Sequence, residues 1–194
     1  MNSIQNYILD NDVDEALTYL NSFSRIIRMT LEFVDMKFIS LSDELVYLQH
    51  YVKLENMRFD ELFDYEVICD KDIDPETTLI PPMLLQPIIE NSIKHGIMQL
   101  NHKGIIKLEI IKIDENSFKC IIEDNGIGRV KAKQVVEEQI KKESIGLKII
   151  KERLDLFNSK GEDGNFKIEI IDLYSDNGEP SGTRVEIILP LVFN

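Results

Sequence analysis

A strand-like run that ends in an acid and a glycine-rich turn places the strongest constraint on this sequence. Residues Ser117–Asp124 form a strand-like run whose apolar part ends in an acid, and Asn125–Gly128 (Asn-Gly-Ile-Gly) follows directly. Asn-Gly is a common hairpin turn, but residues 129–143 are polar and helix-like instead of forming a second strand. A strand, a glycine turn and a helix in succession favour a ligand site where a carboxylate meets accessible backbone.

Residues 1–60 are expected to form a helical hairpin. After Asp12, apolar residues recur at the three-four spacing of an amphipathic helix. They are Val13, Leu17, Leu20, Ile27, Leu31 and Val34. A second helix is expected from Ser42, a candidate N-cap that acidic residues follow. One hairpin alone buries little apolar surface, so this segment is expected to pair with a second copy into a four-helix bundle.

Residues 61–194 are expected to form a mixed domain of helices and largely antiparallel strands. Strands are predicted over 63–69, 104–113, 117–124, 166–174 and 183–192, and helices over 81–100 and 146–157. Pro81 and Pro82 suit the start of the first of these helices, and Pro87 its early part. The mixture without strict alternation predicts an α+β two-layer α/β sandwich.

Charge and composition exclude several classes of function. The net charge is −13, which argues against nucleic acid or an anionic membrane as a partner, because Lys and Arg dominate such binding. The hydrophobic fraction of 43% supports a packed core. No apolar run reaches the roughly 18 residues that a membrane span needs. With 3 His and 2 Cys, a zinc site is not expected.

Three further features suggest one shared ligand. Asn91, Lys94 and His95 fall on one face of a helix, where an amide and two cations suit a metal ion with phosphates. Asp124 at its strand end can accept a hydrogen bond from an exocyclic amine, and Thr183 opens a strand after Gly182. Each motif alone is also typical of a turn or a solvated helix face. Their order within one domain favours a joint nucleotide site.

These segments resemble a known family. "LLQPIIENSIKHGI" resembles the N-box, "DNGIG" the first glycine box and "SIGLKIIKERLDLF" the second glycine box of sensor histidine kinases from the LytS-like, cell-wall and autolysis-regulator subfamily. "GTRVEIILP" resembles the closing strand, and "LSDELVYLQHYVKLENMRF" the helix that leads into the ATP-binding domain. The resemblance covers nearly the whole chain. It implies the Bergerat (GHKL) ATP-binding fold over 61–194, preceded by a dimerisation hairpin over 1–60.

The resemblance also implies roles for single residues. Asn91 would hold Mg²⁺ against the triphosphate of ATP, and Glu90 would act in proton transfer or support the metal. Lys94 and His95 would contact phosphates. Asp124 would bind the adenine amine, with Thr183 completing that end of the site. The remaining residues would shape the pocket or lie at the phosphate end: Gly126, Gly128, Ser144, Gly146 and Leu147. Residues 129–143 would form the ATP lid.

The sequence departs from the family pattern in three places. Ser144 replaces the first glycine of the second glycine box, and Ile149 replaces a common Asn. The family's phosphoacceptor histidine precedes the run that resembles "NSIQNYI", which starts here at Asn2. The chain is therefore expected to bind ATP without phosphorylating itself at that position. The resemblance implies an intact parent that would phosphorylate its histidine and then a response-regulator aspartate, and this parent is expected to be membrane-anchored with this region in the cytoplasm.

Two alternatives stay open. The altered second glycine box allows a degenerate module that only binds nucleotide or dimerises. An ATPase of the gyrase type is less favoured, because such enzymes place a catalytic Glu four residues before the N-box Asn, and Pro87 occupies that position.

Overall fold

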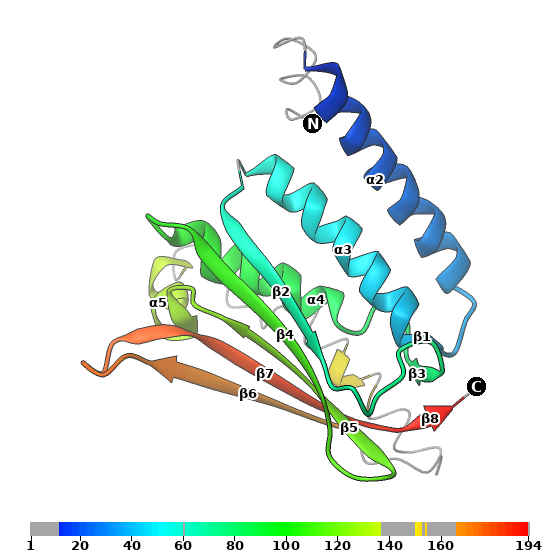
Figure 1. The fold of residues 1–194 in the computed structure, drawn as a ribbon. Helices are drawn as coiled ribbons and strands as arrows, with labels where there is room; N and C mark the ends of the chain where they lie inside the picture. Colours follow the sequence, from blue (N-terminus) through cyan, green and yellow to red (C-terminus); the bar gives the residue numbers. More distant parts are fainter. Residues whose placement is uncertain (1–11, 60, 137–149, 153, 155–165, 194) are drawn as a thin grey trace.

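The structure is built on a five-stranded sheet with the strand order β2-β4-β5-β7-β6. The computed structural model describes residues 12–59, 61–136, 150–152, 154 and 166–193 (Figure 1). The strands of this sheet are β2 (Phe63–Cys69), β4 (Gly104–Lys112), β5 (Ser117–Asp124), β6 (Lys167–Tyr174) and β7 (Pro180–Pro190). Neighbouring strands are antiparallel, except that β2 and β4 run parallel. The predicted α+β fold is confirmed.

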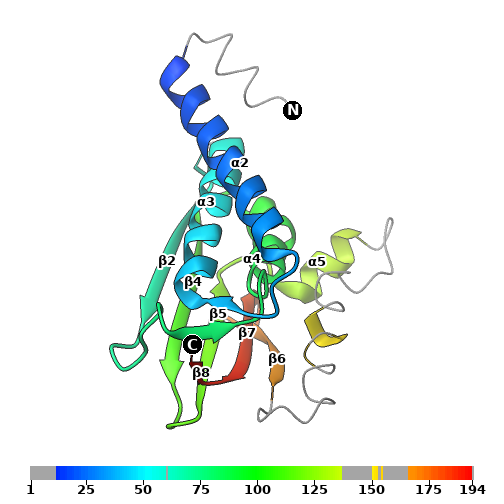
Figure 2. The same cartoon turned by 90° about the vertical axis from the view of Figure 1, so that its right-hand side faces the viewer.

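Helices cover one face of the sheet. The helices are α2 (Val13–Phe33), α3 (Leu41–Arg58), α4 (Gln86–Asn91) and α5 (Gly128–Val136), with a π-helical turn η1 (Ser92–Gly96) and a 3-10 turn η2 (Ile97–Gln99) after α4. Along β5, Phe118, Cys120 and Ile122 are buried, and the residues between them are half-buried. Successive side chains of a strand point to opposite faces, so this pattern identifies one covered face. Helices α3 and α4 lie against it (Figures 1 and 2), as the predicted two-layer sandwich requires.

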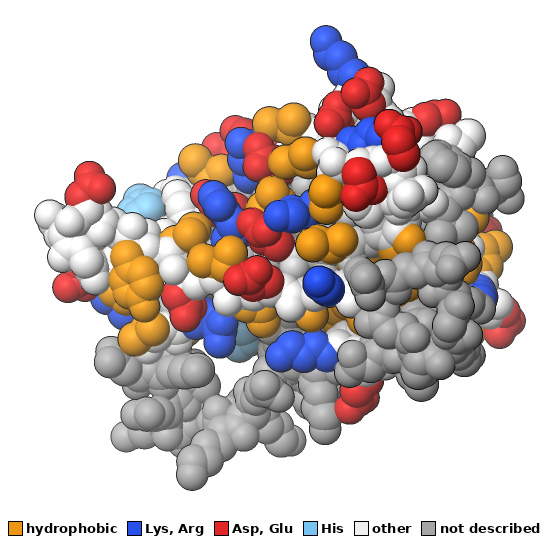
Figure 3. All heavy atoms as spheres, turned by 90° about the horizontal axis from the view of Figure 1, so that it is seen from below, with side chains coloured by type: hydrophobic (Ala, Val, Ile, Leu, Met, Phe, Trp, Pro, Cys, Tyr) orange, Lys and Arg blue, Asp and Glu red, His pale blue; other side chains and the backbone are white. Residues whose placement is uncertain are grey.

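The opposite face of the sheet carries ion pairs between neighbouring strands. Lys119 on β5 pairs with Glu186 on β7 at 2.6 Å, and Arg184 on β7 pairs with Glu123 on β5 at 2.6 Å. Figure 3 shows one side of the molecule, on which apolar side chains are interspersed with both signs of charge. Partly exposed pairs of this kind contribute about 0–1 kcal/mol each, so they favour solubility and strand register more than stability.

Three short strands form a second sheet that the sequence did not predict. They are β1 (Ile39–Ser40), β3 (Thr78–Ile80) and β8 (Val192–Phe193), in the order β1-β3-β8. Strands of two or three residues are too short to show the alternation by which a strand is recognised. This sheet joins the turn of the helical hairpin to the carboxyl-terminal end of the described chain.

The start of α3 differs from the prediction. The N-cap is Ser40, whose hydroxyl accepts a hydrogen bond from the Asp43 N–H at 3.0 Å. Ser42, the predicted cap, lies inside the first turn and donates its hydroxyl to Glu76 Oε1 at 2.8 Å. Two serines two positions apart precede the same acidic residues, so the sequence alone does not distinguish the cap from the first turn.

Helix α2 packs against α3 and leaves an apolar stripe exposed. Its inner residues Ala16, Met29 and Phe33 are buried. Outward-facing apolar residues follow one line along the helix: Val13, Leu17, Leu20, Ile27, Leu31 and Val34, with exposed fractions between 43% and 70%.

Among the described residues, no helix is both long enough and apolar enough to cross a bilayer.

Helix α3 contributes to the same core as the sheet. Leu41, Leu48 and Val52 on α3 belong to one cluster of buried residues with side chains of β4, β5 and β7. Asn56 near the end of α3 donates to the Phe63 carbonyl at 2.9 Å. The predicted domain boundary at residue 60 stays a prediction, but α3 packs as part of the sheet domain.

A buried carboxylate connects α3 to the loop that precedes α4. Glu44 has no exposed surface, and its two oxygens accept hydrogen bonds from the N–H groups of Met83 at 2.7 Å and Leu85 at 3.0 Å. Met83 has a φ of 53°, a left-handed conformation that non-glycine residues rarely adopt. Glu44 therefore holds a strained loop in place on the core, and the same loop sets the start of α4.

Replacing Glu44 by Ala is expected to lower the free energy of unfolding by about 2–5 kcal/mol, because two buried N–H groups lose their acceptor. Urea unfolding followed by circular dichroism would measure this change. Lys53→Ala, an exposed substitution on the same helix, should change stability by about 0.5 kcal/mol or less. A Glu44→Ala loss no larger than that of the control would contradict the assigned role.

Candidate functional site

The N-box segment forms three different helical turns in succession. Helix α4 begins at Gln86 with Pro87 in its first turn, so Pro81 and Pro82 lie in the preceding loop and not at the predicted helix start. The π-helical turn Ser92–Gly96 follows α4 directly. A π-helical turn widens the helix, and such turns occur frequently at functional sites. The predicted single helix over 81–100 is therefore wrong in its start and in its regularity.

Asp124 is the buried acid at the end of β5. Its exposed fraction is 3%. Oδ2 accepts a hydrogen bond from the Ser92 hydroxyl at 2.8 Å, and Oδ1 accepts one from the Gly126 N–H at 2.9 Å. Burial raises the pKa of the Asp124 carboxyl to about 6, while the hydrogen bonds from Ser92, Gly126 and the Thr183 main chain oppose this rise. A carboxylate oxygen has more than one acceptor position, so Asp124 retains capacity for another donor.

Glycines allow two backbones to meet beside Asp124. A Cβ on Gly126 would lie 2.4 Å from the Gly96 Cα, and a Cβ on Gly96 would lie 2.9 Å from Asp124 Oδ1. The Ile127 N–H donates to the Gly96 carbonyl at 3.3 Å. The first glycine box thus has a structural cause within the protein, the close approach of the loop after β5 to the end of η1. This cause is additional to the predicted approach of a ligand.

Two other glycines of the site are also constrained. Gly182 on β7 has a φ of +145°, and a Cβ there would lie 2.0 Å from the Asp124 carbonyl oxygen. Gly128 has a φ of +74°, in the left-handed region that favours glycine. Thr183 is paired across from Asp124 in the ladder between β5 and β7. The structure therefore brings Asp124, Gly126 and Thr183 together, as the sequence predicted.

The charged residues of the N-box are arranged differently from the prediction. Lys94 forms an ion pair with Glu90, and Lys94 and His95 are exposed. The negative charge of Glu90 is close enough to α3 to help raise the pKa of Glu55, after burial, which is the main cause. Asn91 is half-buried at the last position of α4. The prediction that Asn91, Lys94 and His95 share one face depends on a regular α-helix. The chain instead forms a π-helical turn over Ser92–Gly96, which changes the angular spacing of these side chains.

Part of the predicted phosphate end lies outside the described residues. This applies to Ser144, Gly146 and Leu147, and to the predicted lid beyond position 136. The described beginning of that segment is helix α5, which is tied to the hairpin of β6 and β7. Lys131 pairs with Glu179 at 2.7 Å, and Arg129 pairs with Asp172 at 3.7 Å.

Two polar residues of the site, Ser92 and Asn125, are not predictable as site residues from the sequence. The Ser92 hydroxyl orients the Asp124 carboxyl group. Its role cannot be recognised from the sequence, because nothing in the residues around Ser92 indicates a contact with Asp124. Asn125 fixes the loop, since its Oδ1 accepts from the Ile105 N–H at 2.7 Å. The sequence predicts Asn125 as a turn residue. The hydrogen bond of its side chain to β4 depends on the tertiary structure, which the local sequence does not contain.

Together Ser92, Asp124 and Gly126 form a buried hydrogen-bond acceptor with a fixed orientation. A buried carboxylate that Ser92 and Gly126 hold in one orientation can select a ligand by its N–H donors. The side chains of Lys94 and His95 lie on the adjacent helical turn. This combination suits a ligand with an amine at one end and negative charge at the other.

Comparisons with known proteins find similarity to histidine kinases. Residues 1–63 match the family described as histidine kinase. Sensor protein LytS of Oceanobacillus iheyensis is 34% identical over 62% of this chain and 20% of its own length. The uncharacterized protein YwpD of Bacillus subtilis is 32% identical over 75% of this chain and 52% of its own length. The chain therefore spans about half or less of the relatives it matches.

Solved structures show the same fold at low sequence identity. A mycobacterial sensor histidine kinase, MprB, superposes with a TM-score of 0.51 at 17% identity, over 81% of this chain and 98% of that chain. The histidine kinase domain of the Erythrobacter litoralis EL346 blue-light activated histidine kinase superposes with a TM-score of 0.52 at 15% identity, over 95% of this chain and 83% of that chain.

Asp124→Asn is expected to stabilise the folded protein above pH 6. The folded carboxyl releases its proton near pH 6 and the unfolded one near pH 4, so unfolding releases a proton between these values. Wild-type stability from this group therefore falls as the pH rises through that window. Asn lacks this titration, so the mutant should gain up to about 3 kcal/mol relative to wild type by pH 7. Urea unfolding of both proteins at pH 4.5 and 7.5 would measure it, and a stability difference between mutant and wild type that does not grow with pH would contradict it.

Proposed function

We propose that the sheet domain binds Mg-ATP for phosphoryl transfer, because the chain is similar in sequence to LytS-like sensor histidine kinases and has the fold of histidine kinase domains. The observation that carries this proposal is the buried Asp124, which Ser92 and Gly126 orient at a strand end. Burying an ionisable carboxyl group away from water costs stability, and residues with strongly shifted pKa values cluster at functional sites. The exocyclic amine of adenine is the donor that Asp124 would accept.

The other residues would act from the adenine end towards the phosphates. Ser92 is a positioning residue, because its hydroxyl holds the Asp124 carboxyl in one orientation. Gly126, Gly128 and Thr183 would border the adenine. Residues proposed for the phosphate end are Lys94, His95, Ser144, Gly146 and Leu147. Lys94 pairs with Glu90, so it would exchange this partner for phosphate oxygens when ATP binds.

The donor set fits Mg²⁺ with few protein ligands. No group of three or more His, Cys, Asp or Glu side chains in the described part of the chain could hold a metal alone. Mg²⁺ bound with nucleotides takes most of its ligands from phosphates and water, so one amide oxygen from Asn91 is a sufficient protein contribution. Glu90 lies beside Asn91 and would support the metal or accept a proton. Bound Mg²⁺ would neutralise charge on the transferring phosphoryl group.

The phosphoryl group would pass to a histidine of the parent protein and then to an aspartate of a response regulator. None of the 3 histidines in this chain is assigned as the acceptor. His50 is half-buried on α3, and burial, Arg25 and Lys53 lower its pKa. His95 belongs to the proposed phosphate end, and exposed His102 contacts the carbonyl of Lys103. We therefore propose that this chain does not phosphorylate itself on these residues.

Hydrolysis of the gyrase type has less support. Pro87 occupies the position of the water-activating Glu in those enzymes and lies in the first turn of α4, where it offers no proton acceptor. Positioning and charge neutralisation account for phosphoryl transfer without such a base for water.

A homodimer through residues 1–60 would use the exposed stripe of α2. The positions 13, 17, 20, 27, 31 and 34 fit the alternating four-three spacing of a coiled-coil seam, in which Ser24 occupies the position between 20 and 27. All six side chains face solvent, which is costly unless another helix covers them. A second copy of α2 and α3 would complete a four-helix bundle.

ATP binding is tested by calorimetry with Mg-ATP, using Mg-GTP as the comparison ligand. ATP should bind and GTP should bind more weakly, because guanine presents a carbonyl where adenine presents an amine. Asp124→Ala should weaken ATP affinity by about tenfold or more through loss of a charge-assisted hydrogen bond. Glu123→Gln, the neighbouring acid on the opposite face of β5, serves as the matched control.

Unchanged ATP affinity in Asp124→Ala would reject the role of Asp124. Absence of ATP binding to a folded wild-type protein would instead favour a degenerate dimerisation module.

Ile27→Glu is expected to convert the dimer into a monomer, because a charge at the centre of the α2 stripe cannot be buried without a partner. Sedimentation velocity would measure the change. Asn21→Glu adds the same charge at an exposed position off the stripe and should leave the dimer intact. A wild-type protein that sediments only as a monomer would contradict the proposed dimer.

A further inference from the structure

The edge strand β2 presents main-chain groups that no other strand of the described chain pairs with. It is the first strand in the sheet order, so only β4 is its neighbour there. The Leu62 carbonyl accepts a hydrogen bond from the Gly104 N–H of β4, and the Asp70 N–H donates to the Ile110 carbonyl of β4. The main-chain groups of even-numbered residues along β2 therefore point towards β4. The main chain of Phe63 bonds instead to the Asn56 side chain, away from β4. Since this direction alternates along a strand, the N–H and C=O groups of Tyr65 and Val67 also point outwards.

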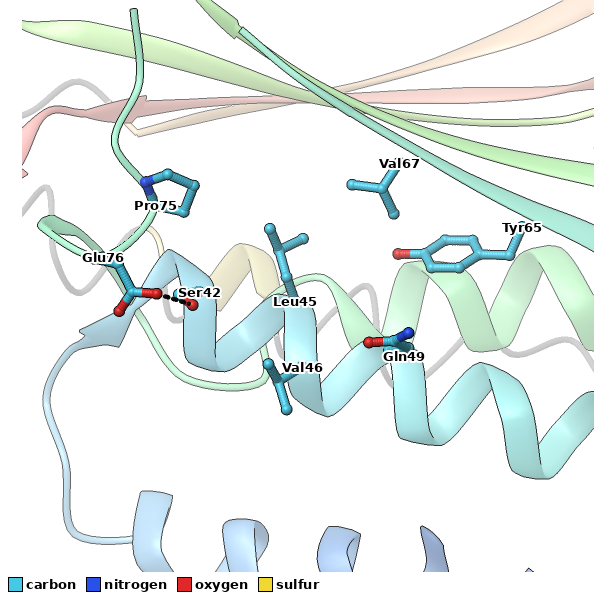
Figure 4. Close-up of a pocket in the computed structure, with 8 residues that line it drawn as sticks. All are labelled: Ser42, Leu45, Val46, Gln49, Tyr65, Val67, Pro75 and Glu76. Carbon is cyan, nitrogen blue, oxygen red and sulfur yellow. Dashed lines mark hydrogen bonds between the residues drawn. The ribbon is translucent and has the colours of Figure 1, made fainter. Parts of the chain in front are cut away.

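A groove runs beside these outward-facing groups. It has a volume of about 490 Å³, and Tyr65 and Val67 of β2 form one of its walls. Leu45, Val46 and Gln49 of α3 form the other wall, and Ser42, Pro75 and Glu76 close one end (Figure 4). Tyr65 Oη is buried and has no hydrogen-bond partner among the described residues. The groove therefore combines apolar walls with a hydroxyl that lacks a partner.

The surroundings of the groove are acidic. Glu66 on β2 and Glu76 at the end of the groove are exposed, as are Asp72 and Asp74 in the loop between them. Lys71 is the basic residue of this loop. Charge complementarity favours a basic occupant, since a second copy of this chain would bring a net charge of −13 to the same place.

We propose that the β2 edge and its groove bind an extended segment of another polypeptide, with alternating apolar and basic side chains, as an added strand. The main-chain groups of Tyr65 and Val67 would pair with the segment, as in β-strand addition. Its apolar side chains would enter the groove, and its Lys or Arg side chains would meet the acidic loop. This surface shares no residue with the proposed nucleotide site, so it is a separate activity of the domain.

The test uses a fluorescein-labelled peptide of alternating lysine and valine with the 7-residue length of β2. Binding is followed by fluorescence anisotropy at several salt concentrations. The same peptide N-methylated on alternate residues keeps its charge but loses the donors of one edge. In the protein, Val67→Pro removes an outward N–H that the β2–β4 ladder does not use, and Val67→Ala shortens the side chain but keeps this N–H.

The peptide should bind wild type and Val67→Ala, and binding should weaken by about tenfold or more for Val67→Pro and for the N-methylated peptide. Unfolding midpoints of both variants close to wild type would confirm that the fold is retained. Equal binding in all combinations would mean association by charge alone and would overturn the proposal. A wild-type dimer that Val67→Pro disrupts would assign the edge to a second copy and would also overturn it.

Discussion

Close backbone contact between Gly96 and Gly126 is the constraint on which the candidate site depends. With any larger residue, the loop after β5 could not lie against the end of η1, and Asp124 would not be covered. Coverage removes water from the carboxyl and raises its pKa, while Ser92 and the Gly126 N–H make the buried charge tolerable. Packing, electrostatics and ligand selectivity are therefore linked at one contact between a helical turn and a strand end.

The parts of the fold that were predictable are those with a strong local period. β4 and β5 are runs of eight or more residues rich in Ile, and α2 repeats its apolar residues over several turns, so each is predictable from its own sequence. The three-stranded sheet was missed because its strands hold two or three residues each. The choice of Ser40 over Ser42 as N-cap depends on the tertiary contact between Ser42 and Glu76, which local sequence does not contain.

The candidate site was predictable in composition but not in geometry. Asp124, Gly126 and Thr183 were identified from motifs and lie together. The face assigned to Asn91, Lys94 and His95 assumed a regular α-helix, whereas the chain forms a π-helical turn there. Ser92 contacts an acid that is remote in sequence, so its role depends on how the helix meets β5. Glu44 is similar, because a buried acid on an apolar helix face reads as a solvated residue until the loop that it binds is seen.

The parallel pairing of β2 with β4 has a consequence for the order in which the domain assembles. β4 and β5 form a hairpin with a short connection, which closes at low entropic cost. β2 reaches β4 only through the long crossover that contains α4 and η1, and contacts between distant residues form slowly. The Ser92 hydroxyl belongs to that crossover, whereas Asp124 belongs to the early hairpin. The β4–β5 hairpin would therefore form before the Ser92 hydroxyl lies against Asp124 and fixes the orientation of its carboxyl group.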